Sequence, residues 1–129
     1  MAKKTLPKLK AELQKVFNAY IRKRDSEDGY FTCISCGVTK TTLQMNAGHF
    51  YAVKGYDYLR YDEMNVHGEC ASCNCFNESH LILYAINLEN KLSEAELNEL
   101  HLKAKFYKMN GYKWSRPELE ELIIKYKNL

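Results

Sequence analysis

The sequence predicts an α+β fold in which a zinc-braced core lies between an N-terminal helix and C-terminal helices. Two Cys-x-x-Cys pairs, Cys33–Cys36 and Cys70–Cys73, are separated by a few dozen residues. Between them, apolar and polar residues alternate as in a half-buried strand. Near both ends of the chain, apolar residues recur at helical spacing. A chain of 129 residues with a net charge of +3 is expected to form one domain.

The four paired cysteines, Cys33, Cys36, Cys70 and Cys73, predict a structural zinc site. Each Cys-x-x-Cys turn aims two sulfurs at one point, so two turns can surround Zn²⁺ tetrahedrally. The alternative is two disulfides, which persist in oxidising compartments. Because the chain opens without a signal peptide and has no membrane-spanning stretch, we expect a reduced, cytoplasmic setting and zinc. We expect Cys75 to be a small buried residue of the following helix rather than a spare ligand.

The segment between the cysteine pairs predicts an irregular hairpin. Alternation over residues 43–51 predicts its first strand, and Asn65, His67 and Glu69 share one face of a second strand. The loop at residues 54–61 is rich in tyrosine and basic side chains. Such a loop suits a nucleic-acid backbone, but it equally suits a roof over the small zinc core. The sequence leaves both interpretations open.

Helical patterns flank this core on both sides. Residues 8–24 predict an amphipathic helix whose apolar stripe packs on the core, and residues 30–90 form the core with its own helix. Residues 93–129 predict a helical extension. Each of its helices begins with a capping box, at Ser93–Glu96 and at Ser115–Glu118.

The core residues resemble the HNH, or ββα-metal, nuclease family. In that family a histidine ends the first strand of a hairpin, an asparagine lies in or after the loop, and a His or Asn begins the following helix. His49, Asn65 and Asn74 match these positions. The chain resembles the NinG, or Rap, family of phage recombination proteins more closely still. That resemblance rests on Val16–Asp25, Cys33–Gly37, Ala47–Phe50, Asn65–Cys70 and Cys73-Asn74.

The resemblance implies a metal-dependent DNA endonuclease. His49 would deprotonate the attacking water, and Asn65 would hold the imidazole in the right tautomer, either by its side chain or through backbone hydrogen bonds. Asn74 would offer a carbonyl oxygen to a catalytic Mg²⁺ or Mn²⁺. The implied substrate is branched or strand-invasion DNA, cut during phage or prophage recombination in the cytoplasm of a bacterial host. A homodimer would suit a symmetric junction.

One position departs from the HNH pattern. The residue before the catalytic histidine is an Asp or His ligand in many members, but here it is Gly48. We expect the replacement ligand among Asn46, His67 and Glu78, the last of which lies one helical turn beyond Asn74. His67 could instead be a hydrogen-bonded residue beneath the zinc site. The missing ligand favours the alternative of a non-catalytic zinc module that binds DNA or a recombination partner.

Basic residues in two segments are candidates for contacts with DNA. Lys54 and Arg60 belong to the tyrosine-rich loop, while Arg22, Lys23 and Arg24 end the first predicted helix. The net charge of +3 is modest for a protein that binds DNA by electrostatics alone. Local clusters therefore matter more than the total charge.

Overall fold

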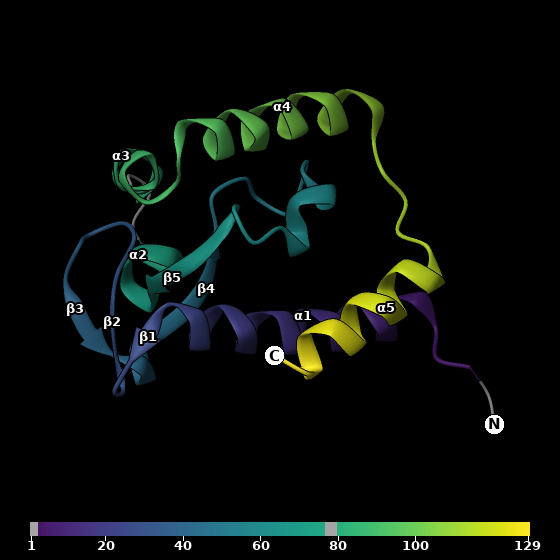
Figure 1. Ribbon diagram of the computed structural model, residues 1–129, viewed down its shortest axis with the longest axis horizontal. Coiled ribbons are helices and arrows are strands. Elements are labelled where there is room, and N and C mark those ends of the chain that lie inside the picture. The colour runs from purple at the N-terminus through teal and green to yellow at the C-terminus, as the bar shows by residue number, and fades with distance from the viewer. Residues whose placement is uncertain (1–2, 77–79) are drawn as a thin grey trace.

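The computed structural model describes residues 3–76 and 80–129, which form five α-helices and two small antiparallel sheets (Figure 1). Helices α1 (Leu6–Arg24) and α5 (Arg116–Lys127) lie side by side on one side of the molecule. Helix α4 (Glu94–Asn110) runs along the opposite side, with the second sheet between them. This mixed architecture confirms the predicted α+β class.

The first sheet follows α1 directly and consists of β1 (Ser26–Glu27), β2 (Tyr30–Thr32) and β3 (Thr39–Thr41), in that order. The turn between β1 and β2 holds Asp28 and Gly29 at φ values of 52° and 82°. The first cysteine pair lies in the loop between β2 and β3. The sequence indicated no strand in this region, because strands of two or three residues are too short to show a period.

The second sheet is the hairpin of β4 (Met45–His49) and β5 (Val66–Cys70). Directly opposed residues of an antiparallel pair project from the same face of the sheet. The register therefore sets Asn46 opposite Glu69 and Gly48 opposite His67 on one face, and Ala47 opposite Gly68 and His49 opposite Val66 on the other. Ala47 and Val66 pack against α1, so the second face is the α1 face.

The helices after the second cysteine pair follow the prediction in part. The single helix expected to reach Asn90 is described as α2 (Ala71–Phe76) and α3 (His80–Lys91), with residues 77–79 outside the described range. Both predicted capping boxes are present at the starts of α4 and α5. In each, a serine hydroxyl accepts a hydrogen bond from the third helical N–H.

Three groups of buried side chains fill the spaces between these elements. The largest joins α1 and α5 to the end of the 3₁₀ helix η2 (Asp57–Tyr61) and to Trp114. The second joins α3 and α4 to Leu59 of η2. The third surrounds the cysteines with Phe31 and Met45. The hairpin β4–β5 borders all three groups, which fixes the orientation of both its faces.

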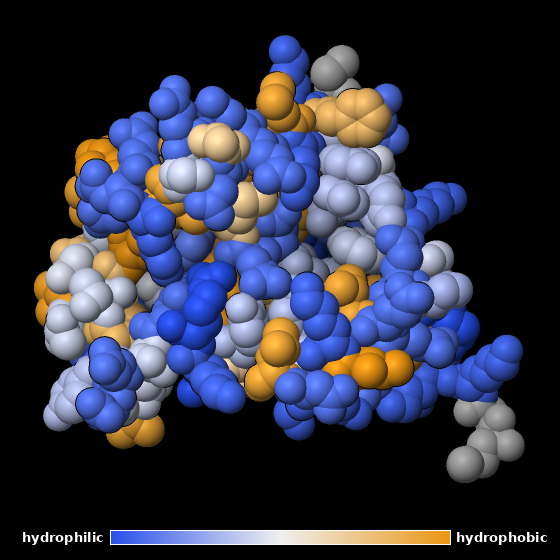
Figure 2. All heavy atoms as spheres, in the orientation of Figure 1, coloured by the Kyte–Doolittle hydropathy of each residue, from blue (hydrophilic) through white to orange (hydrophobic). Residues whose placement is uncertain are grey.

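Hydrophilic side chains cover most of the face seen in Figure 2, and hydrophobic side chains form separate patches there. One such patch lies at the edge where Figure 1 shows α3. The exposed apolar residues of α3 are Leu81, Ile82, Leu83 and Ile86. Among the described helices, none combines the length and apolar character that crossing a membrane requires.

Arg24 was expected to contact DNA, but its guanidinium points into the protein. It donates hydrogen bonds to the carbonyls of Glu63 and Val66, each at 2.8 Å, and to both carboxylate oxygens of Asp25 at 2.8 and 3.0 Å. It also lies 3.1 Å from Nδ1 of His67. Arg24 thus ties the end of α1 to β5, and the expected role in DNA binding is wrong for this residue.

Asp25 is the acidic centre of the same cluster. It accepts a hydrogen bond from the backbone N–H of Gly68 at 2.8 Å and lies 3.1 Å from the ammonium of Lys91. Burial acts to raise its pKa, but the hydrogen bonds from Arg24 and the charge of Lys91 outweigh it and lower the pKa of Asp25 to about 2. The carboxylate is therefore ionised across the physiological range.

We expect Arg24→Ala to lower the free energy of unfolding by about 3 kcal/mol, because it leaves Asp25 as a largely buried charge without its main partner. Arg22→Ala, a change two residues away at an exposed site, should alter the free energy of unfolding by less than about 0.5 kcal/mol. Urea denaturation of both variants measures the difference. Equal stability of the two variants would contradict a structural role for Arg24.

Candidate metal centre and catalytic face

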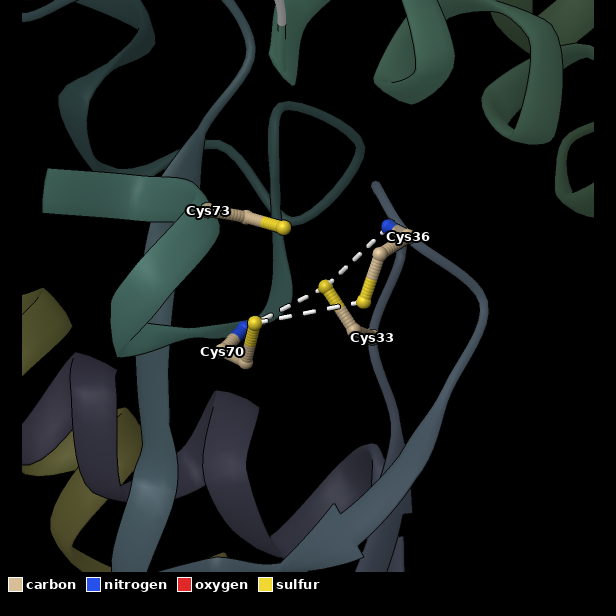
Figure 3. A group of neighbouring side chains, drawn as sticks. All are labelled: Cys33, Cys36, Cys70 and Cys73. Carbon is tan, nitrogen blue, oxygen red and sulfur yellow. Dashed lines mark hydrogen bonds between the residues drawn. The ribbon is translucent and has the colours of Figure 1, made fainter. Parts of the chain in front are cut away.

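The four paired cysteines converge on one point (Figure 3). Their Sγ atoms all lie within 4.8 Å of one another, and those of Cys36 and Cys70 are 4.0 Å apart. A tetrahedral ion with Zn–S bonds of 2.3 Å sets its sulfurs about 3.8 Å apart, so the spacing fits. All the cysteines are free thiols, which excludes the disulfide alternative in this structure. Cys33, Cys36, Cys70 and Cys73 are therefore arranged to hold a metal ion such as zinc.

Hydrogen-bond donors surround these sulfurs. The backbone N–H groups of Cys36 and Cys70 donate to Sγ of Cys33 at 3.4 and 3.3 Å, and the ammonium of Lys40 lies 3.4 Å from Sγ of Cys70. Burial acts to raise the pKa of Cys70, but hydrogen bonds from Cys73, Cys33 and Lys40 lower it to about 7. Four thiolates on one divalent ion leave an excess of negative charge, which Lys40 partly offsets.

His49 ends β4 with its imidazole fixed by a backbone carbonyl. Nε2 lies 2.9 Å from the carbonyl oxygen of Arg60, and a carbonyl only accepts hydrogen bonds, so Nε2 carries the proton. Nδ1 is then the basic nitrogen. Burial is the main cause that lowers the pKa of His49, with the nearby charge of Arg60 acting in the same direction. The imidazole is neutral at physiological pH and can accept a proton at Nδ1.

Asn65 contacts the loop rather than the imidazole. Its side chain is buried, accepts a hydrogen bond from the N–H of Tyr51 at 2.8 Å, and donates to the carbonyls of Tyr51 and Leu59 at 3.0 Å each. These bonds join both ends of the loop that connects β4 to β5. The carbonyl of Arg60, not the side chain of Asn65, contacts the imidazole of His49, so the first of the two routes expected for Asn65 is wrong. The backbone carbonyl of Asn65 accepts a hydrogen bond from the N–H of Phe50, the residue after His49, at 2.9 Å.

Asn74 lies on α2 with its side chain exposed. Helix α2 contacts both strands of the hairpin, and His49 projects from the α1 face. In the described part of the chain, His49 makes no hydrogen bond with Asn65 or Asn74. The three predicted catalytic residues thus belong to one stretch of strand, strand and helix, and no hydrogen bond joins their side chains in the described part of the chain.

His67 is a hydrogen-bonded core residue. Of the two roles expected for it, a metal ligand or a hydrogen-bonded residue beneath the zinc site, this matches the second. Its Nε2 donates to the carbonyl of Met64 at 2.9 Å, and its Nδ1 accepts from Arg24 at 3.1 Å. Burial, followed by the positive charge of Lys91, lowers the pKa of His67 to about 4. With both nitrogens engaged and the ring 1% exposed, His67 does not offer a metal ligand.

The other expected ligands differ in position. Asn46 is half-buried on the Gly48 face, and its side-chain amide lies 3.8 Å from Sγ of Cys75. Cys75 is exposed, which corrects its predicted burial, because the short helix α2 turns this residue away from the core. Glu78 lies outside the described residues.

Sequence reasoning missed the acid–histidine pair Glu69–His80. Glu69 is fully buried. Its Oε2 accepts a hydrogen bond from the hydroxyl of Ser35 and also lies 2.6 Å from Nδ1 of His80. The position of Glu69 on the strand face was visible in the sequence. Nothing in the spacing showed that His80, eleven residues on, returns to it.

The remaining basic candidates are mostly available to a ligand. Arg22, Lys23 and Lys54 are exposed. Arg60 is half-buried and donates from Nε to the side chain of Gln14 at 2.8 Å, so it helps to fix η2 on α1. The exposed cations therefore lie at the end of α1 and in the loop before η2.

Comparison with known proteins identifies the family. The family model described as NinG, bacteriophage lambda NinG protein, matches residues 1–129. The chain belongs to the NinG family. The NinG proteins of Escherichia phage 933W, Salmonella phage P22 and Escherichia phage lambda are 32%, 31% and 30% identical to it over 115 residues. That alignment covers 89% of this chain and 52–53% of each relative, so the chain spans about half their length. No solved structure gives a significant match.

Removing one cysteine should remove the metal. We expect Cys70→Ser to lose bound zinc and most of its folded structure, because a structural zinc site contributes roughly 10–16 kcal/mol of apparent folding free energy in small domains. Cys75→Ser, at the exposed fifth cysteine, should keep both. Metal analysis and circular dichroism of the two variants measure this. Full zinc content in Cys70→Ser would exclude the four-cysteine site.

The buried imidazole of His67 predicts a pH dependence of stability. Its pKa is about 4 in the folded chain, below the ordinary histidine value of about 6.5, so between these two values the unfolded chain binds more protons. The free energy of unfolding should therefore fall as the pH drops from 6.5 through 4, by about 3 kcal/mol in total.

A variant without the imidazole isolates this contribution. His67→Asn should be less stable at pH 7 and show a flatter pH profile than the unsubstituted chain, because zinc release on acidification affects both equally. Urea denaturation between pH 7 and pH 4.5 measures the two slopes. Parallel profiles would show that His67 does not titrate as its burial requires.

Proposed function

We propose that this chain is a metal-dependent DNA endonuclease of the HNH type. The observation that carries the proposal is His49, a neutral imidazole at the end of a hairpin strand, with Nε2 held by the Arg60 carbonyl and Nδ1 left as the base. The succession of β4, β5 and α2, with the cysteine cluster where β5 meets α2, supports it. Membership of the NinG family supports a role in a phage or prophage, within a bacterial host cell.

The chemistry follows from the tautomer of His49. Nδ1 accepts a proton from the water that attacks the phosphodiester, and the carbonyl of Arg60 keeps the imidazole oriented and stabilises the imidazolium that forms. A bound Mg²⁺ or Mn²⁺ supplies charge stabilisation to the phosphate and the departing oxygen. Asn74, exposed on α2, would offer an amide oxygen to such an ion.

Contacts with DNA would come from the exposed cations and aromatic rings near the hairpin. Arg22, Lys23 and Lys54 can meet phosphates, and the rings of Tyr51 and Tyr56, with centroids 4.8 Å apart, can meet bases. A preference for branched or strand-invasion DNA, and a homodimer on a symmetric junction, follow from the family resemblance. Recombination is the process that such a substrate implies.

A second candidate function is a zinc module that binds DNA or a recombination partner without cutting. One observation favours it: within residues 3–76 and 80–129, no hydrogen bond links His49 to Asn74. The two candidates differ in a single measurable property, phosphodiester cleavage.

We expect His49→Ala to reduce nicking of branched DNA in Mg²⁺ or Mn²⁺ by roughly 10²–10⁴-fold, the usual contribution of a general base. Its zinc content and its affinity for the same DNA should stay unchanged, which separates lost chemistry from lost folding. Gel assays on branched and linear DNA measure both properties. Binding without any cutting by the unsubstituted chain would favour the zinc module.

A further inference from the structure

Glu69 occupies the space that a side chain at residue 48 would fill. A Cβ built on Gly48 would lie 2.9 Å from Cβ of Glu69 and still closer to Oε1. Glu69 belongs to β5, whereas Gly48 precedes His49 on β4. In the HNH pattern, the residue before the histidine places its own side chain in this space. Here the carboxylate of Glu69, from the neighbouring strand β5, occupies it.

One oxygen of this carboxylate lacks a partner. Oε2 accepts a hydrogen bond from the hydroxyl of Ser35 and contacts His80. Oε1 is shielded from solvent and, among the described residues, has no hydrogen-bond partner. A buried carboxylate oxygen without a hydrogen-bond partner destabilises the folded chain. A buried oxygen such as Oε1 of Glu69 is usually satisfied by a bound ion or a water molecule.

Nearby cationic side chains are engaged elsewhere. Arg24 and Lys91 both pair with Asp25, at 2.8 and 3.1 Å. In the described part of the chain, the ionic partner of Glu69 is His80, whose Nδ1 lies 2.6 Å from Oε2. A buried carboxylate is stable when it is paired or bound to a metal, and neither Arg24 nor Lys91 supplies the charge here.

The pair Glu69–His80 offers the donor atoms of a divalent-cation site. Two ligands bound at right angles to an ion at about 2.1 Å are about 3.0 Å apart, so the observed 2.6 Å must widen by only about 0.4 Å. Asn46, directly opposite Glu69 across the hairpin, adds an amide group on the same face. The side chain of His80 is 17% exposed while Glu69 is 0% exposed, so an ion would enter past His80.

We propose that Glu69 and His80 bind a divalent cation on the Gly48 face of the β4–β5 hairpin. The cation is of the class represented by Mn²⁺, which accepts both carboxylate and imidazole ligands. Its catalytic purpose rests on the proposed endonuclease function, in which Glu69 supplies the ligand absent at Gly48. Its existence as a site rests only on the geometry above.

Mn²⁺ binding to the zinc-loaded full chain tests the proposal. We expect the unsubstituted chain to bind one Mn²⁺, measured by calorimetry and by the Mn²⁺ paramagnetic resonance signal. Glu69→Gln and His80→Ala should each weaken binding at least tenfold, with zinc content unchanged. His101→Ala is the matched control, because His101 is an exposed histidine that contacts the Tyr51 hydroxyl. It should bind Mn²⁺ as tightly as the unsubstituted chain.

A third variant keeps both ligands and changes only the space between the strands. Gly48→Ala sets a methyl group against the carboxylate of Glu69, and it should weaken Mn²⁺ binding without removing a donor atom. Circular dichroism checks that each variant is folded. Binding that is absent from the unsubstituted chain, or equally tight in folded Glu69→Gln and His80→Ala, would overturn the site.

Cleavage assays on the same variants separate this site from the proposed function. Mn²⁺ binding that depends on Glu69 and His80, in a chain that cuts no DNA, supports the site and refutes the endonuclease. Cutting that survives unchanged in both variants refutes the catalytic purpose of the site and leaves the endonuclease in place.

Discussion

Four sulfur atoms within 4.8 Å of one another constrain the rest of this structure, because thiolates this close repel unless a cation lies among them. The sulfurs come from the β2–β3 loop, from the end of β5 and from α2, so three segments distant in the chain meet at one point. The small cluster of Phe31 and Met45 around them contains too little apolar surface to hold these segments alone. A metal ion held by the four cysteines would therefore supply stability that this small cluster lacks.

The hairpin β4–β5 transmits that constraint to both sides of the molecule. Its α1 face is apolar apart from His49, and it packs on the core shared by α1 and α5. Its Gly48 face is polar and carries His67 and Glu69, both fully buried. Arg24 and Asp25 close the end of this face through hydrogen bonds to β5. The ladder of five residue pairs thus places His49 on one face of the hairpin and the buried Glu69 on the other.

Patterns with strong local causes were predictable from the sequence. The cysteine spacing indicated the metal site, the apolar period indicated α1, and two serine–glutamate pairs indicated the starts of α4 and α5. The order of the five segments that carry the family resemblance also predicted family membership, and the family model confirms it.

The contacts that the sequence did not predict depend on how separate segments return to one another. Arg24 was expected to contact DNA. Its actual partners, the carbonyls of Glu63 and Val66, are backbone atoms about forty residues away in the sequence, and no side-chain pattern indicates them. Cys75 was predicted to be buried, because the sequence did not indicate how short α2 is. His80 begins α3 and contacts Glu69 of β5, and no sequence period links these two positions.

The contact between Gly48 and Glu69 also bears on how such proteins are recognised. Motif searches look for an acidic residue next to the histidine on the same strand. Here Glu69 lies on the partner strand, two pairs along the ladder from Gly48, and the glycine leaves room for its carboxylate. A Gly-His dipeptide facing a glutamate just ahead of a Cys-x-x-Cys turn is therefore the signature to seek, and a one-strand pattern would pass over chains built in this way.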